Sequence, residues 1–199
     1  LTKFQRAYNP VFVESDSSIA FLSSSDGSQN IFQFDLKTKK VIQLTHFDDH
    51  SILRGLHIDN ENNRLIFNRT QHHYRDVYHY SFSDSSVSSV LNSQFWDERD
   101  ASFSNKTLIH SDDRSGVYNL RINDDHYVTN VLGGAFMADI NEQGDIVYSL
   151  YENGKYMIAL LINPQPMNDA NVGYKSDHYL INAEHDDPII EQINTDAHT

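Results

Sequence analysis

Four units of the same kind follow one another along this chain, each made of short apolar strands separated by polar turns. They run from Pro10 to Thr45, from Leu56 to Leu91, from Ala101 to Thr129 and from Phe136 to Leu160. Sequence repeats of about 38 to 46 residues arise from small structural units that stack on one another and share a core. The repeat therefore limits the chain to architectures built from copies of one small unit.

The strands within a unit predict the blades of a β-propeller. In the first unit, the second strand Ile19-Ala20-Phe21 is continuously apolar, whereas the third alternates, as in Ile31 and Gln33. The aromatic share of 12% favours strands, because flat rings pack well on a pleated surface. We expect an all-β fold of propeller blades, each with four antiparallel strands, forming an incomplete propeller or part of a larger one.

The two ends of the chain lead to separate expectations. Leu1-Thr2 resembles Leu44-Thr45, which closes the first unit, so the chain is expected to open on the last strand of a preceding blade. Residues 1–162 would then form the blades. Residues 163–199, a segment rich in acidic side chains, would form a linker or exit segment. An open stack leaves unpaired edges, so the rest of a parent chain or an oligomer is expected to complete the propeller.

Composition argues against several kinds of partner. With 28 acidic and 15 basic residues, the net charge of −13 would repel a phosphate backbone, so no nucleic acid is expected. No apolar run approaches the roughly 18 residues of a spanning helix, so we expect no membrane insertion by this segment. There is no cysteine for a disulfide or a thiolate metal site.

The repeats resemble those of the TolB-type β-propeller family. The first unit carries most of the resemblance, in Pro10, Ile19, Ala20, Phe21, Ile31, Phe32, Asp35, Leu36, Leu44 and Thr45. It departs from the family at Ser15-Asp16-Ser17, where a Pro-Asp-Gly turn is usual. The resemblance implies a location in the periplasm or cell envelope, and such blades also form the non-catalytic propellers of prolyl oligopeptidase-type peptidases. It says little about function.

No motif in the sequence predicts catalysis. A Gly-x-Ser-x-Gly elbow, a His-Glu-x-x-His motif, a P-loop and a dinucleotide fingerprint are all missing, so we expect no catalytic residue and no cofactor in this segment. Candidate metal ligands are His46, Asp48, Asp49 and His50, or the pair His72 and His73, but neighbouring side chains on an extended loop should point apart, which disfavours a metal site. Asp112, Asp113 and Gly116 are interpreted as a turn rather than a calcium loop.

The candidate binding residues lie in loops that the family geometry would place on one face. These loops join the fourth strand of a unit to the next unit, or the second strand to the third. Trp96 is the single tryptophan, and Trp and Arg are favoured contact residues, although Trp96 could equally cap the next blade. The predicted binding residues are Asp48, Asp49, His50, His72, His73, Phe95, Trp96, Asp97, Arg99, Asp112 and Arg114.

These features predict a binding or scaffold propeller rather than an enzyme. The first hypothesis is a bacterial cell-envelope or exported protein that presents an acidic, aromatic face to a protein or peptide. The second is the substrate-gating propeller of a prolyl oligopeptidase-type peptidase whose catalytic domain lies elsewhere. The third is a glycan-binding or glycan-processing propeller, in which paired carboxylates around Trp96 would matter.

Overall fold

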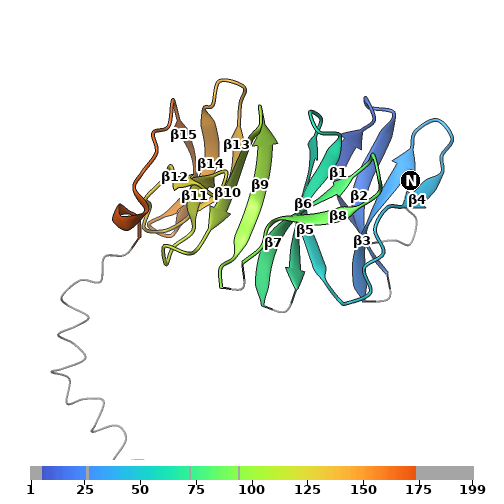
Figure 1. Ribbon diagram of the computed structural model, residues 1–199, viewed down its shortest axis with the longest axis horizontal. Helices are drawn as coiled ribbons and strands as arrows, with labels where there is room; N and C mark the ends of the chain where they lie inside the picture. Colours follow the sequence, from blue (N-terminus) through green and yellow to red (C-terminus); the bar gives the residue numbers. More distant parts are fainter. Residues whose placement is uncertain (1–5, 26, 72, 94, 174–199) are drawn as a thin grey trace, which may run out of the picture.

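The computed structural model describes residues 6–25, 27–71, 73–93 and 95–173, which form four antiparallel sheets, here called blades 1 to 4 (Figure 1). The all-β class and the blade organisation predicted from the repeat are confirmed. The strands of blades 1 and 2 are β1 (Arg6–Val13), β2 (Ser18–Ser25), β3 (Ser28–Asp35), β4 (Val41–Gln43), β5 (Ile52–Asp59), β6 (Arg64–Gln71), β7 (Tyr74–Ser81) and β8 (Val87–Leu91). Those of blades 3 and 4 are β9 (Glu98–Ser104), β10 (Thr107–Asp112), β11 (Asn119–Ile122), β12 (His126–Tyr127), β13 (Ala135–Ile140), β14 (Ile146–Glu152) and β15 (Lys155–Leu161).

Consecutive strands pair within each blade, and in the part of the chain that the structure describes blade 4 has three strands where the others have four. The third strand of the third unit was predicted to include Val117 and Tyr118, but β11 begins only at Asn119. Tyr118 leaves the sheet because its hydroxyl donates to Asp97 over 2.9 Å and its ring packs on Phe136, with centroids 5.3 Å apart. Tertiary contacts therefore override the local strand pattern at this point.

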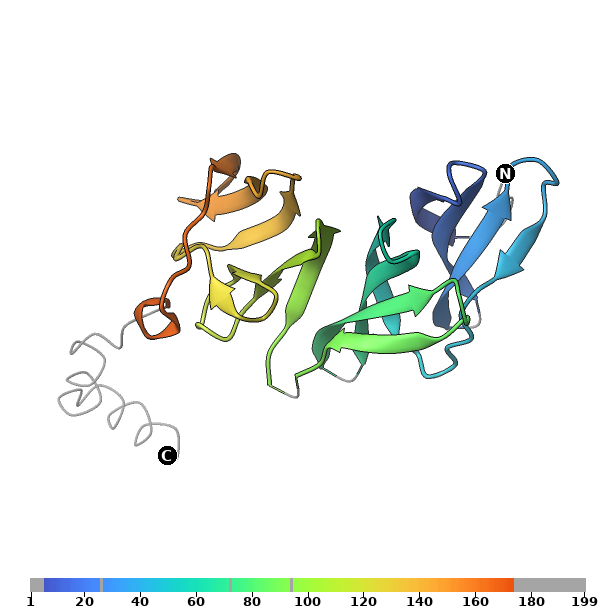
Figure 2. The same ribbon diagram turned by 45° about the horizontal axis from the view of Figure 1, so that its top comes forward.

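The apolar core lies between neighbouring blades rather than inside any one of them. Figure 2 shows the blades following one another in sequence order. One buried cluster joins blades 1 and 2 through residues such as Leu22 and Phe67, and a second joins blades 2 and 3 through Val77 and Ala101. A third joins blade 3 to blade 4. Blade 4 has no following blade among the described residues, and Ile158 on its free face is 78% exposed.

The first strand of every blade contains a β-bulge at the same place. The strand register shifts there in all four blades, and one residue adopts a positive φ, between 51° and 61°. A bulge bends the strand and re-aims the side chains beside it. The four residues are Asn9, Gly55, Asp100 and Met137.

The bulge residues connect one blade to the next. Asp100 Oδ2 accepts the Met137 N–H of blade 4 over 3.3 Å. Blade 2 has glycine at this position, and Asn68 provides the connection instead, because its Oδ1 accepts the Asp100 N–H and its Nδ2 donates to the Glu98 carbonyl, both over 3.0 Å. A Cβ on Gly55 would lie only 3.0 Å from that Asn68 oxygen, so the side chain at this position and the Asn68 bridge compete for one space.

A hydrogen-bonded pair of Asn and Thr fixes the chain that leaves the fourth strand in blades 1 and 3. Thr45 Oγ1 donates to Asn30 Oδ1, and Thr129 Oγ1 donates to Asn119 Oδ1, each over 3.0 Å. Each threonine hydroxyl also accepts a backbone N–H of the third strand. By strand register Met157 takes the place of these asparagines in blade 4, and its thioether is only a weak acceptor, in keeping with the three strands that the described residues form there.

Beyond β15 the described chain returns to the edge of blade 3. Met167 pairs with Tyr127 as an isolated bridge, and Asp169, in the short 3-10 helix η1 (Asp169–Asn171), forms an ion pair of 2.8 Å with Arg121. Residues 163–173 of the predicted exit segment therefore pack against a blade. Within the described residues, no helix has the length and apolar character needed to cross a lipid bilayer.

Candidate binding face

The connections that carry the predicted binding residues gather at one end of the blades. In Figure 1 the β4–β5 and β8–β9 connections both lie along the lower edge of the molecule. Contacts between them and the hairpin loops agree, because a Cβ on Gly27 would lie 3.3 Å from His50 Nδ1, and the Asp97 N–H donates to Asp113 Oδ1 over 2.9 Å. We call this end the loop face.

The β8–β9 connection presents two aromatic side chains to solvent. Phe95 is 71% exposed and Trp96 is 40% exposed, and their ring centroids are 6.2 Å apart. Both backbone N–H groups donate to Ser93 Oγ, over 3.1 and 3.2 Å. The backbone under the two rings is thus held in place while the rings themselves stay accessible.

Asp97 ties this aromatic loop to the hairpins on either side. Its Oδ1 accepts the backbone N–H of Arg75 over 2.9 Å, and its Oδ2 accepts the hydroxyl of Tyr118 over 2.9 Å. Burial, followed by the hydrogen bond to Asp97, raises the pKa of Tyr118, which therefore remains a donor at neutral pH. Asp97 therefore orders the loop, with one hydrogen bond accepted at each carboxylate oxygen.

Asp49 also has a structural partner. Its carboxylate forms an ion pair with Arg69 and accepts the hydroxyl of Ser51, while Arg69 lies over the ring of Phe47 at 4.3 Å. These contacts fix the β4–β5 connection onto blade 2. The neighbouring Asp48 and His50, and His73 in the β6–β7 turn, are exposed, whereas His72 lies outside the described residues.

Asp112 and Arg114 were predicted as loop residues of the face, but Asp112 is the last residue of β10 and is fully buried. Arg114 Nε lies 2.7 Å from Asp112 Oδ2, and the Tyr127 hydroxyl donates to Oδ1 over 2.8 Å. The burial is possible because these groups, with Arg121 Nε at 3.6 Å, compensate the carboxylate. Within blade 3 the carboxylate of Asp112 is thus closed off from solvent, whereas the side chain of Arg114 keeps 23% of its surface exposed.

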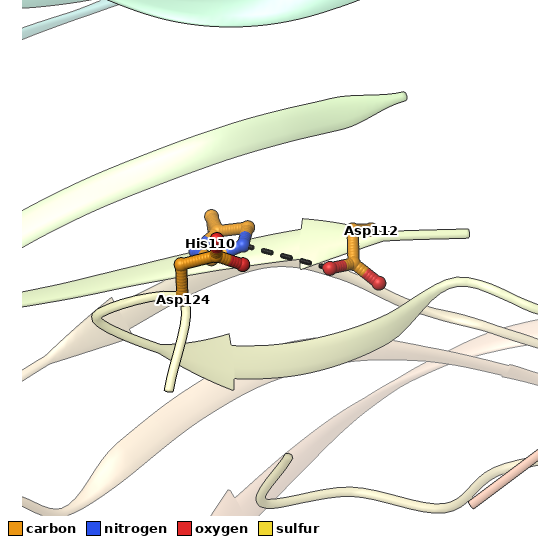
Figure 3. Close-up of side chains that lie close together, drawn as sticks. All are labelled: His110, Asp112 and Asp124. Atoms are coloured by element: carbon orange, nitrogen blue, oxygen red, sulfur yellow. Dashed lines mark ion pairs between the residues drawn. The ribbon is translucent and has the colours of Figure 1, made fainter. Parts of the chain in front are cut away.

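Three side chains in this region come close enough to suggest a metal site. The ligand atoms of His110, Asp112 and Asp124 all lie within 4.8 Å of one another, and His110 Nε2 is 3.7 Å from Asp112 Oδ2 (Figure 3). However, Arg114 also reaches Asp124, at 2.7 Å, so its guanidinium already bridges the two carboxylates. A divalent cation would have to displace that charge. The geometry therefore fits an ion-pair network better than a metal centre.

The sequence reasoning missed a carboxyl pair at the junction of blades 2 and 3. Asp76 and Glu98 lie close enough there for their charges to interact, and burial, then the Asp76 charge, raises the pKa of Glu98 to about 8. Burial also raises the pKa of Asp76. The strand register offered a signal, because Asp76 occupies in blade 2 the place of Asn30 and Asn119, where an amide is replaced by an acid.

A hollow lies at the opposite end of the molecule. It has a volume of about 780 Å³ and is formed by the β1–β2 and β5–β6 turns, with Glu14 and Asp16 on its wall. Both acids are exposed and adopt positive φ angles in a tight turn. None of the predicted binding residues lines it.

Comparison with known proteins identifies the fold but no close relative. No protein-family model and no curated protein matches the sequence. Among solved structures, TolB from Acinetobacter baumannii matches with a TM-score of 0.63 at 17% identity, over 80% of this chain and 42% of that chain. The putative TolB from Agrobacterium tumefaciens matches with a TM-score of 0.66 at 11% identity, over 80% of this chain and 63% of that chain. Dipeptidyl peptidase 4 from Porphyromonas gingivalis matches with a TM-score of 0.55 at 12% identity, over 85% of this chain and 32% of that chain.

These likenesses show a β-propeller architecture. The described blades cover 42% and 63% of the two TolB chains, so the present chain spans less than two thirds of either. At such low identity the comparison carries no residue-level information about ligands.

Proposed function

We propose that this chain is a non-catalytic binding segment of a propeller, which presents its loop face to a protein or peptide in a bacterial cell-envelope or exported protein. One observation carries the proposal, namely the exposed pair Phe95 and Trp96 on a backbone that Ser93 and Asp97 hold in place. Exposing large rings to water is unfavourable, and holding them in a fixed geometry lowers the entropic cost of binding a partner. The TolB likeness supports the compartment by analogy.

We also propose that further blades cover the free face of blade 4. Tyr156, Ile158 and Leu160 are each more than 60% exposed there, on the side that in other blades packs against the next one. The rest of a parent chain is the expected source, since the TolB structures are longer than this chain. Light scattering during size exclusion would test the other source: a dimer would mean that a second copy supplies the blades.

A second candidate function is the substrate-gating propeller of a peptidase. The fold likeness to dipeptidyl peptidase 4 favours it, and it would use the same loop face to admit peptides. A hydrolase domain in the full-length sequence would decide for this candidate.

The sole tryptophan makes the binding proposal directly testable. Peptides would be selected from a random display library on the immobilised chain, then titrated while the emission of Trp96 is recorded. A saturable blue shift is expected, because a bound peptide removes water from the indole ring. Phe95→Ala should weaken binding about tenfold or more, since exposed aromatic anchors contribute much of the energy at interfaces.

Phe12→Ala provides the matched control. Phe12 is 57% exposed on β1, outside the loop face, and its loss should leave the affinity of selected peptides unchanged. Selected peptides whose affinity falls for Phe12→Ala but not for Phe95→Ala would rule out the loop face. Selection that yields no peptide shifting Trp96 would count against peptide binding altogether.

A further inference from the structure

Three arginines lie close together at the junction of blades 2 and 3, near the loop face. Arg54 is in β5, Arg75 in β7 and Arg99 in β9, each within the first three residues of its strand. Arg75 pairs with Thr70 and Thr70 with Ile52, so Arg75 and Arg54 point to the same side of blade 2. That side faces blade 3, because Val77, two residues after Arg75, packs against Ala101.

Two of these guanidinium groups form no ion pair with any residue that the structure describes. Arg64, Arg69, Arg99, Arg114 and Arg121 each have a carboxylate oxygen within 4.0 Å, whereas among the described residues Arg54 and Arg75 have none. The Nε atom of Arg75 is buried and has no hydrogen bond. A buried donor left unpaired is costly, which is why such groups in native structures are commonly explained by a ligand or by water.

The electrostatic surroundings of Arg75 agree with this. Burial and the neighbouring charges of Arg99 and Arg54 lower its pKa, while Asp97 and Asp100 act in the opposite direction. Two like charges beside a half-buried guanidinium are unfavourable, and they stand in a chain whose net charge is −13. An anion placed among them would relieve the repulsion.

Blade 1 has a neutral side chain at the position that corresponds to Arg75. By strand register Gln29 is the equivalent of Arg75, and its Oε1 accepts both the Leu53 N–H of the next blade, over 2.7 Å, and the hydroxyl of Tyr8. Arginine has five donors and no acceptor, so Arg75 cannot make this bridge to blade 3. Its donors require an acceptor that the described chain does not provide.

The charge balance of the cluster selects the kind of anion. Asp97 is engaged by Tyr118 and the Arg75 backbone, and Asp100 Oδ2 lies 3.1 Å from Arg99 Nε. Three guanidinium groups against these two carboxylates leave a single net positive charge. A monoanionic carboxylate matches it better than a dianionic phosphate, and its two oxygens fit the planar fork of arginine.

We infer that Arg75, flanked by Arg54 and Arg99, binds a carboxylate of the peptide or protein that occupies the loop face. This inference deepens the proposed function and rests on it, because Asp97 joins the arginine cluster to the aromatic loop of Phe95 and Trp96. The carboxylate is either the C-terminus of the partner or an acidic side chain, which share one chemistry.

The test observes the Nε–Hε signals of arginine in the ¹⁵N-labelled chain by NMR. Three probes are titrated: N-acetylglycine, which carries a carboxylate like a peptide C-terminus; N-acetylglycinamide, its neutral match; and inorganic phosphate. The Arg75 signal should shift and saturate with N-acetylglycine, with a millimolar dissociation constant, and should not respond to the amide. Arg54→Gln should weaken that binding severalfold, because one of the flanking charges is lost.

Lys40→Gln is the charge-matched control, since Lys40 lies in the exposed β3–β4 turn and its loss changes the net charge equally. It should leave the dissociation constant unchanged. No shift with N-acetylglycine, an equal shift with the amide, or tighter binding of phosphate would overturn the inference.

Peptides selected on the loop face separate this inference from the proposed function and identify the source of the carboxylate. If amidation of the peptide C-terminus alone weakens peptide binding about tenfold, the bound carboxylate is the C-terminus. If only a Glu→Gln or Asp→Asn change in the peptide weakens binding, the bound carboxylate is an acidic side chain. If peptides shift Trp96 but bind equally well with every carboxyl group neutralised, the inference fails and the binding function stands.

Discussion

Asn9 in β1 and Leu56 in β5 exchange two hydrogen bonds across the junction of blades 1 and 2. Asn9 Nδ2 donates to the Leu56 carbonyl over 3.3 Å, and the Leu56 N–H donates to Asn9 Oδ1 over 3.0 Å. Asn9→Gly removes both bonds but keeps a residue that tolerates the φ of 52°. We expect the free energy of unfolding in urea to fall by about 1–3 kcal/mol, because two backbone groups lose their partner.

Asn153→Gly is the control for that change. Asn153 has a φ of 51° in the exposed β14–β15 turn and makes no side-chain hydrogen bond within the described chain. Asn153→Gly should lower the free energy of unfolding only slightly. Equal losses of stability for the two variants would mean that the glycine substitution itself, rather than the lost hydrogen bonds at the junction, causes the effect.

Gly55→Ala should destabilise the chain more than Gly144→Ala. Both glycines have positive φ, 61° and 85°, so both alanines meet the same kind of backbone strain, about 1–2 kcal/mol. A Cβ at Gly144 meets nothing within 4 Å, whereas at Gly55 it lies 3.0 Å from Asn68 Oδ1. Asn68 is held at both ends by hydrogen bonds to blade 3 and has little freedom to move. Equal midpoints in urea for the two variants would contradict this role of Asn68.

Glu98 should make stability depend on pH. Its pKa is about 8 in the folded chain against an ordinary 4.5, so the folded state holds a proton that the unfolded state has lost between these values. The stability that Glu98 contributes is therefore fully present below pH 4.5 and is lost as the pH rises from there through 8. Glu98→Gln, which stays neutral, should flatten this fall by at least about 1.4 kcal/mol, the equivalent of one pKa unit.

Urea unfolding at pH 6 and pH 8.5 measures that difference. Glu142→Gln, in an exposed turn, serves as the control and should keep the wild-type slope. A Glu98→Gln variant with an unchanged slope would mean that Glu98 is ionised in the folded chain.

Arg114→Met should be among the most damaging changes in blade 3. It leaves Asp112 buried beside Asp124 without the guanidinium that bridges them, and breaking a buried pair in this way costs about 3–5 kcal/mol. Thermal unfolding measures the loss, with Lys106→Met in an exposed turn as the control for removing a cation. Zinc or calcium added to the wild type should leave its melting temperature unchanged, and a clear rise would show that a metal can replace Arg114.

The sequence predicted the repeated unit because strand and turn chemistry recur locally. The apolar run Ile19-Ala20-Phe21 and its counterparts became central strands of the blades. The bulges escaped prediction, because Asn9, Gly55, Asp100 and Met137 share no side-chain chemistry; they share only a backbone position set by the next blade.

The candidate site was less predictable, because burial of charge depends on residues distant in sequence. Asp112 and Arg114 stand in a polar run typical of an exposed loop, yet Arg121 and Tyr127 from other strands allow Asp112 to be buried. Arg75 was overlooked for the converse reason. It follows a polar stretch, and only the packing of blade 2 on blade 3 reveals that its guanidinium lacks an acceptor.

Because each apolar cluster is shared by two sheets, a single sheet of this chain is not a folding unit. Removing β13–β15 would uncover Ile109 and Leu120 in blade 3, which would then lose their main apolar partners. The stability of each sheet should depend on its contacts with the neighbouring sheets, as in a one-dimensional cooperative array. A substitution that weakens one junction should therefore also weaken the next. Every fragment made by domain dissection should consequently contain at least two adjacent sheets, because a single sheet would be left without a neighbour to share its apolar cluster.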